Sequence, residues 1–202
     1  MIFTQFGLRR IWMKTMNGKQ RIITALEIKE SDYVPLYIHG INEGPIIGIG
    51  KQLTDGLPEP QDFRLMNDND KLKLVDTLFM IHEAFDIDGI TTFEIGHETR
   101  VDDLHVKDGF GVTYKLSEHG IPVPVGHPVK TIDDFQGFKP PSPRREDLAL
   151  LDLAIDRFKG NKASFWLMRG VFVRSWRLMG MTNFMTNIYS NPEFVHKVAR
   201  MM

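Results

Sequence analysis

Three short apolar runs, rich in β-branched and aromatic residues, alternate with segments of helical pattern along this chain. They cover residues 34–38, 88–94 and 162–168. Each run is continuous rather than alternating, which is typical of strands buried on both faces of a parallel sheet. Apolar residues spaced three and four apart fill the segments between them and predict helices. The sequence therefore predicts an α/β fold built from βα units.

Helix signals define these units more closely. Asn17 and Gln20 form a capping pair for a first helix, and residues 67–70 begin a second helix of about four turns. Residues 40–61 are rich in Gly and Pro and predict a long loop with at most a helical turn at Ile46 and Ile47. The second helix should bury one apolar stripe, made of Leu72, Val75, Leu78, Phe79, His82 and Phe85. Four further helices are predicted. The first begins at residue 131, and the second begins at Ser142-Pro143 and should bury Leu148, Leu151, Ile155 and Phe158. The third is one long helix over residues 173–188, and the fourth begins at Asn191.

Residues 100–130 interrupt this pattern. Short β-like pieces alternate there with turns and prolines, which predicts an antiparallel excursion after the second strand. A closed βα-barrel has eight units in about 250 residues. We therefore expect residues 16–202 to form the N-terminal portion of a TIM-type (βα)8 barrel, the alternative being a small three-layer domain. Residues 1–15 are expected to be a disordered extension.

The charge balance excludes several classes of partner. There are 25 Lys and Arg residues against 26 Asp and Glu, which gives no excess of basic residues for nucleic acid. Every apolar run is too short to span a bilayer. The chain has no cysteine, so it has no disulfide and no thiolate nucleophile of its own. We expect a cytoplasmic protein that acts on a small molecule, without nucleic acid or membrane as partner.

Polar residues follow each predicted strand. His39 follows the first, Glu94 and His97 follow the second, and Arg169 follows the third. Because the carboxyl ends of parallel strands meet at one face, these side chains predict a shared cleft with a base, an acid and a cation. Any one of them alone is better explained as a strand cap, but together they favour an active site.

Three segments resemble the uroporphyrinogen decarboxylase superfamily. They are residues 17–26, residues 32–36 and the stretch from Met179 to His196. This superfamily also contains methyltransferases that move methyl groups between corrinoid proteins and thiols such as coenzyme M. The resemblance runs from about residue 16 to 202 and covers the N-terminal part of a family member. It implies a βα-barrel and an enzymatic function.

The resemblance also suggests individual roles. Glu94 stands where the decarboxylases keep a catalytic aspartate, and Trp176 replaces a tyrosine that faces substrate. After the first strand, decarboxylases carry two arginines, whereas this chain has Gly40 to Gly44 with Glu43 between them. Since bidentate arginines are natural partners of the carboxylates of uroporphyrinogen, their loss favours the methyltransferase branch.

In that branch a zinc ion held by His and Cys activates the acceptor thiol. Those ligands would belong to chain beyond residue 202, so no metal ligand is assigned here. A corrinoid is the expected methyl donor, and a corrinoid protein is a possible partner. We expect Glu94, with His39 and His97, to act in catalysis, Arg169 to bind an anionic group of the substrate, and Trp166 and Trp176 to form a flat wall.

Two alternatives stay open. In uroporphyrinogen decarboxylation, Arg169 or Arg174 would have to replace the lost arginines. The second alternative is a vestigial, non-catalytic protein. The DNA sequence beyond codon 202 would distinguish methyl transfer from these two alternatives. If residues 16–202 are an unclosed barrel, the isolated chain should be inactive and should self-associate through an open sheet edge.

Overall fold

The computed structural model describes residues 14–116 and 121–202, so most of the predicted N-terminal extension lies outside the described residues. The chain divides into two compact units, each formed from separate stretches of sequence. Unit 1 contains residues 14–57, 72–92 and 151–166. Unit 2 contains residues 58–71, 93–116, 121–150 and 167–202.

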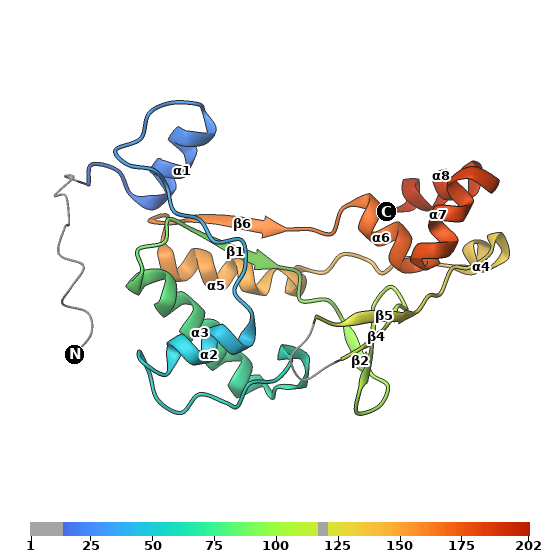
Figure 1. The fold of residues 1–202 in the computed structure, drawn as a ribbon, viewed down its shortest axis with the longest axis horizontal. Coiled ribbons are helices and arrows are strands. Elements are labelled where there is room, and N and C mark those ends of the chain that lie inside the picture. The colour runs from blue at the N-terminus through green and yellow to red at the C-terminus, as the bar shows by residue number, and fades with distance from the viewer. Residues whose placement is uncertain (1–13, 117–120) are drawn as a thin grey trace. The chain divides into compact units, whose positions relative to one another are not determined.

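Unit 1 contains a parallel pair of strands and the helices around it (Figure 1). Its elements, some of which extend by a few residues into unit 2, are α1 (Gly18–Leu26), α2 (Glu43–Gly50), α3 (Asp68–Ala84), β1 (Gly89–Phe93), α5 (Ala149–Phe158) and β6 (Ala163–Leu167). Strands β1 and β6 point the same way in Figure 1. Ala163 donates its N–H to the Asp88 carbonyl (2.9 Å), and the Thr92 hydroxyl donates to the Phe165 carbonyl (3.1 Å). These two strands confirm the parallel part of the predicted α/β fold.

The predicted first strand, residues 34–38, is wrong as a strand. The structure has only an isolated parallel bridge there, between Tyr37 and Gly89. Pro35 has no N–H to donate. The N–H of Leu36 donates to a side-chain oxygen of Asp88 (2.8 Å) instead of extending a ladder. The run is therefore extended next to β1 but contributes one bridge rather than a strand.

The core of unit 1 lies on one face of β1. Phe79 from α3 and both Ala154 and Phe158 from α5 pack against Ile90. The predicted stripe on α3 is partly wrong, because Leu72 is 60% exposed and Phe85 is 51% exposed. The buried face also carries Leu74, Thr77 and Ile81, and Thr77 fits there because its hydroxyl donates to the Lys73 carbonyl within the helix (2.7 Å).

Two helical predictions in unit 1 have clear outcomes. The capping pair is confirmed, since Asn17 accepts from the N–H of Gln20 (2.8 Å) and Gln20 accepts in return from the N–H of Asn17 (2.9 Å). The loop predicted over 40–61 contains the helix α2, which buries Ile46 and Ile47. Two adjacent buried isoleucines stabilise this helix despite its three glycines and one proline.

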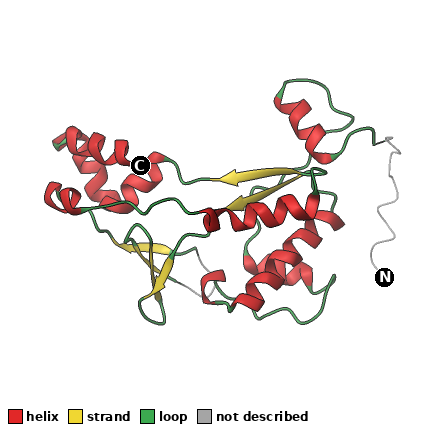
Figure 2. Ribbon diagram, turned by 180° about the vertical axis from the view of Figure 1, so that it is seen from behind, coloured by secondary structure: helices red, strands yellow, loops and turns green. Residues whose placement is uncertain are grey.

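Unit 2 combines an antiparallel sheet with a group of short helices. The sheet has four strands, and strands are drawn in yellow in Figure 2. Its elements are η1 (Phe63–Leu65), β2 (Glu98–Arg100), β3 (His105–Asp108), β4 (Thr113–Lys115), β5 (Val123–Gly126), α4 (Ile132–Gly137), η2 (Arg145–Leu148), α6 (Val171–Met179), α7 (Met181–Ser190) and α8 (Pro192–Met201).

The sheet confirms the antiparallel excursion. Its strands follow the chain in the order β2-β3-β4-β5, with Thr99 opposite Lys107 and Val106 opposite Tyr114. The inward side chains of this sheet and the helices α6, α7 and α8 share one core, which contains Val106, Tyr114, Leu116, Leu178, Phe184, Phe194 and Val198. The sheet therefore fixes the position of α6 within unit 2.

The long helix predicted over residues 173–188 is wrong, because Gly180 divides it into α6 and α7. Gly180 has φ +84° and ψ 137°, a conformation that side-chain-bearing residues rarely adopt. A Cβ at this position would lie 3.1 Å from Cδ2 of His127. The ring of His127 also donates to the Arg177 carbonyl (2.7 Å), so the break is held against the segment that follows β5.

No helix within residues 14–116 and 121–202 is both long enough and apolar enough to cross a membrane.

Candidate functional site

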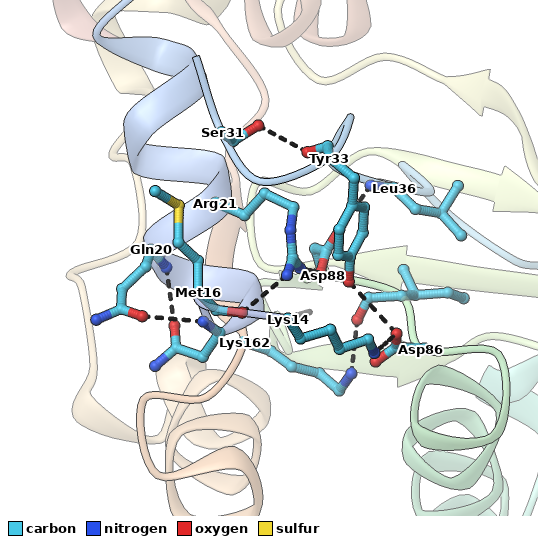
Figure 3. Close-up of polar contacts among 12 residues, drawn as sticks. Lys14, Met16, Gln20, Arg21, Ser31, Tyr33, Leu36, Asp86, Asp88 and Lys162 are labelled. Carbon is cyan, nitrogen blue, oxygen red and sulfur yellow. Dashed lines mark hydrogen bonds and ion pairs between the residues drawn. The ribbon is translucent and has the colours of Figure 1, made fainter. Parts of the chain in front are cut away.

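A cluster of charged side chains surrounds a hollow in each of the two units. In unit 1 the centre of the cluster is Arg21, which is 1% exposed (Figure 3). Its Nε donates to Asp32 (2.6 Å), its Nη2 donates to the Met16 carbonyl (2.8 Å), and its Nη1 donates to Asp88. The ring of Tyr33 stacks on the guanidinium, with 3.4 Å between the guanidinium carbon and the ring centroid.

This cluster is a structural link rather than a reactive site. Hydrogen bonds from Arg21 hold the pKa of the Asp32 carboxyl well below its usual range. Asp88 precedes β1, and Arg21 belongs to α1, so the ion pair fixes the first helix against the start of the strand. Gly18 allows this close approach, since a Cβ there would lie 2.8 Å from Cα of Asp88. Arg21 uses four of its five N–H donors on these partners.

The hollow in unit 2 has a different composition. It is shallow and open to solvent, and it is lined by Asp108, Phe110, Val112, Tyr114, Arg169, Arg174, Arg177 and Leu178. Strand β3 and the turn after it supply one wall, and helix α6 with the segment before it supplies the arginines. Three guanidinium groups therefore lie around one small space.

Asp108 holds the aromatic wall of this hollow in place. One carboxylate oxygen accepts from the N–H groups of Phe110 and Val112 (both 3.0 Å), and the other accepts from the Tyr114 hydroxyl (3.0 Å). Burial raises the pKa of the Tyr114 hydroxyl, and the charge of Asp108 raises it further. Tyr114 therefore remains a protonated donor, and Asp108 serves mainly to order the turn at Gly111.

The three arginines differ in how well they are matched by partners. Arg174 donates to the carboxylate of Glu94, and its guanidinium carbon lies 4.1 Å from the centroid of the Phe110 ring. Arg177 donates from Nη1 to the oxygen of Tyr114 (3.3 Å), while its buried Nε has no hydrogen-bond partner in the described structure. Arg169 has no ion pair or hydrogen bond with any described residue. Desolvation lowers the pKa of its guanidinium, and the charges of Arg177 and Arg174 lower it further.

The structure brings some of the predicted site residues together. Arg169 lines the hollow, and Glu94 lies next to it through its ion pair with Arg174. Trp176 belongs to the same unit, but it packs against the core, with the Arg177 guanidinium 5.6 Å from its ring centroid. His97 is exposed, and its Nδ1 lies 3.5 Å from Nη1 of Arg144.

His39 and Trp166 belong to unit 1. His39 is exposed, and its Nδ1 lies 3.4 Å from the Tyr37 hydroxyl. That hydroxyl also forms a hydrogen bond with Thr91 Oγ1 (2.5 Å). Trp166 is half-buried on β6. The roles predicted for these residues stay predictions.

Sequence reasoning missed Arg177, Tyr114 and Asp108 as parts of the site. The spacing of Arg174 and Arg177 was a usable signal, because residues three apart on a helix share a face. Asp108 and Tyr114 carry no such signal, since they meet only through the pairing of β3 with β4.

Within residues 14–116 and 121–202 the structure has no group of three His, Asp or Glu side chains that could hold a metal ion. Zinc sites of the expected kind use His and Cys, and the chain contains no cysteine. The described residues therefore do not fit a zinc ion.

The comparisons with known proteins give one informative match. No protein-family profile matches the sequence, and no curated protein matches it. The structure is similar to that of a methyltransferase from Methanosarcina mazei, with a TM-score of 0.64 and 13% sequence identity. The match covers 92% of this chain and 52% of that one, so this chain spans about half the length of the methyltransferase. At this identity the similarity shows a shared fold.

Proposed function

We propose that this chain takes part in enzymatic methyl transfer, as a member of the methyltransferase branch of the uroporphyrinogen decarboxylase superfamily. The observation that carries the proposal is the similarity of 92% of the chain to a methyltransferase structure. The sequence resemblance over residues 17–26, 32–36 and 179–196 points to the superfamily, and the loss of both arginines at residues 40–44 favours this branch. The two lines of support are separate, because the structural similarity compares backbones and the sequence resemblance compares residue types.

The proposed architecture is the opening part of a βα-barrel. The bridge at Tyr37 and the strands β1 and β6 lie side by side in chain order and run parallel. Consecutive parallel neighbours are what a βα-barrel requires. Catalytic residues of such barrels follow the strands, and Glu94 directly follows β1.

The proposed reaction moves a methyl group from a corrinoid to a thiolate. In such a transfer a corrinoid would supply the methyl group and would keep the bonding electron pair, and the thiolate sulfur would supply the pair for the new carbon–sulfur bond. Glu94 is ion-paired with Arg174, so it is suited to accept a hydrogen bond from substrate and orient it. Arg169, which no described carboxylate neutralises, would bind an anionic group of the substrate. The described residues do not fit zinc, and no step is assigned to a metal.

Uroporphyrinogen decarboxylation remains the second candidate because of one observation. Arg169 and Arg174, the residues that would have to replace the two lost arginines, line the same hollow. The hollow is shallow and far smaller than a pocket for a drug-sized ligand. It does not hold a tetrapyrrole ring system, so methyl transfer is preferred.

The test is methyl transfer by the affinity-tagged protein isolated from its own cells, together with any polypeptide that accompanies it. Methylcobalamin and 2-mercaptoethanol are the substrates, and mass spectrometry measures the methyl thioether formed. We expect turnover above the protein-free rate, and a loss of about ten-fold or more for Glu94→Gln. Arg200→Gln, a change of an exposed arginine on α8, is the matched control and should leave the rate unchanged. A rate equal to the protein-free rate, with carbon dioxide released from uroporphyrinogen, would favour the second candidate.

A further inference from the structure

The hollow of unit 1 lies at the amino ends of β1 and β6. Its volume is about 180 Å³, whereas a single water molecule needs only about 10–15 Å³. Asp88 directly precedes β1, and Lys162 directly precedes β6. Active sites of βα-barrels form at the carboxyl ends of the strands, so a ligand of this hollow would not be the substrate of the proposed reaction. The lining includes Lys14, Arg21, Asp86, Asp88, Asn161 and Lys162, most of which are labelled in Figure 3.

Lys162 is a cation of this hollow without a carboxylate partner. Its Nζ donates to the Ile87 carbonyl (2.7 Å), which uses one of its three N–H donors. It forms no ion pair with any described residue. Burial lowers the pKa of its ammonium group, although the charges of Asp86 and Asp88 favour the protonated form. An oxygen anion in the hollow would therefore meet two free N–H donors and would stabilise the charge of Lys162.

Arg21 and Asn161 add further donors to the same hollow. Arg21 has one N–H left, on Nη1, because its other four donate to Asp32, Asp88 and the Met16 carbonyl. The side-chain amide of Asn161 forms no hydrogen bond with any described residue. Together with Lys162, these groups suit the two oxygens of a carboxylate.

Asp86 supplies the opposite charge. Its Oδ2 accepts from Lys14 and lies 3.5 Å from the Tyr33 hydroxyl, whereas its Oδ1 has no partner among the described residues. A cationic group in the hollow could therefore donate to Oδ1 of Asp86 without displacing Lys14.

The charges around the hollow are balanced. Three cations stand against three carboxylates, namely Lys14, Arg21 and Lys162 against Asp32, Asp86 and Asp88. A ligand with a net charge would disturb this balance, whereas a zwitterion leaves it unchanged. We propose that this hollow binds a small α-amino acid, with its carboxylate at Lys162 and its ammonium group at Asp86.

The experiment is a calorimetric titration of the purified 202-residue chain with L-alanine at pH 7. Saturable binding is expected for the unaltered chain. Lys162→Gln and Asp86→Asn should each weaken it about ten-fold, because each removes the charge that one end of the ligand contacts. Asp86 has φ +53°, a conformation that Asn also tolerates, so the substitution keeps the backbone. Lys51→Gln and Asp55→Asn change exposed residues of unit 1 outside the hollow, and these controls should bind L-alanine as the unaltered chain does.

Acetate and ethylamine carry the two charges of L-alanine on separate molecules. We expect each to bind the unaltered chain at least about ten-fold more weakly than L-alanine, since each contacts one end of the hollow. This comparison needs no variant, so it holds even where a substitution affects folding, which circular dichroism measures.

Absence of saturable L-alanine binding would overturn the proposal, as would acetate binding of equal strength. Unchanged affinity in a folded Lys162→Gln or Asp86→Asn variant would overturn it as well. Because binding is measured without turnover, its absence would leave the proposed methyl transfer unaffected, and a failure of methyl transfer would leave this site unaffected.

Discussion

Arg174 on helix α6 forms an ion pair with Glu94, and its guanidinium also lies over the ring of Phe110. One side chain therefore links helix α6 to Glu94 and to the turn after β3, all within unit 2. This link determines which charges of the hollow are neutralised and which remain for a ligand.

Removal of the Glu94 charge should strengthen the anion binding proposed for Arg169. In Glu94→Gln, Arg174 loses its carboxylate partner, and the hollow gains one unit of positive charge. We expect phosphate to bind about two- to five-fold more tightly, the range that corresponds to a charge interaction near the surface. Titration calorimetry measures the change. Weaker binding in Glu94→Gln would mean that Glu94 supports anion binding at Arg169 rather than opposes it.

Arg169→Gln should make the folded chain slightly more stable at low salt. The neighbouring arginines disfavour its charge, and it has no carboxylate partner among the described residues. A gain of about 0.2–1 kcal/mol in the free energy of unfolding is expected, measured by urea denaturation at low ionic strength. The gain should fall in 0.5 M sodium chloride, because salt screens the repulsion. A loss of stability at low salt would contradict this account of the hollow.

Arg21→Met should destabilise unit 1 strongly. The substitution leaves the carboxylates of Asp32 and Asp88 without their common partner, and breaking a buried ion pair costs about 3–5 kcal/mol. Urea denaturation gives the free energy of unfolding. Lys19→Met on the same helix is the control, since Lys19 is exposed and its change should cost less than about 0.5 kcal/mol. Similar losses for the two variants would show that the cluster does not fix α1.

The same cluster predicts how stability depends on pH. The pKa of Asp32 is lower in the folded chain than in the unfolded chain, chiefly because Arg21 donates hydrogen bonds to it. The unfolded chain therefore binds a proton at Asp32 first as the pH falls. The stability from this group is present above the unfolded pKa of about 3.9 and is lost as the pH falls below it.

Urea denaturation at pH 6 and pH 3 measures this dependence. Asp32→Asn should be less stable than the unaltered chain at pH 6, and the difference should shrink at pH 3. A difference that is the same at both values would contradict the assignment.

Much of the fold follows from local sequence signals. The capping pair of Asn17 and Gln20, the continuous runs that became β1 and β6, and the turn-rich stretch of the antiparallel sheet all act within a few residues. The errors arose where a distant contact or a single residue changed the outcome. The N–H of Leu36 donates to the side chain of Asp88, 52 residues away in sequence, and is therefore not available to a neighbouring strand.

The sequence contains a signal for the break at Gly180, because a glycine within an apolar helical pattern is compatible with either a continuous helix or a helix break. What decides between the two is His127, which fills the space that a side chain at residue 180 would need. That contact depends on the arrangement of unit 2 and cannot be obtained from spacing.

The candidate site shows the same limit. Glu94 and Arg169 were identified because each directly follows an apolar run. Arg177 belongs to the site through its place on α6, and Tyr114 belongs to it through the register of β4 against β3. Pairing register joins residues far apart in sequence, so a single sequence does not reveal it.

The most direct test of the whole account compares two thiols as methyl acceptors for the protein isolated from its own cells. They are 3-mercaptopropionate, which carries a carboxylate, and 2-mercaptoethanol, which carries none. With methylcobalamin as donor, we expect kcat/KM to be about ten-fold higher for 3-mercaptopropionate, and we expect Arg169→Gln to remove this preference. Methyl transfer no faster than without protein, or a preference that Arg169→Gln leaves unchanged, would contradict the account.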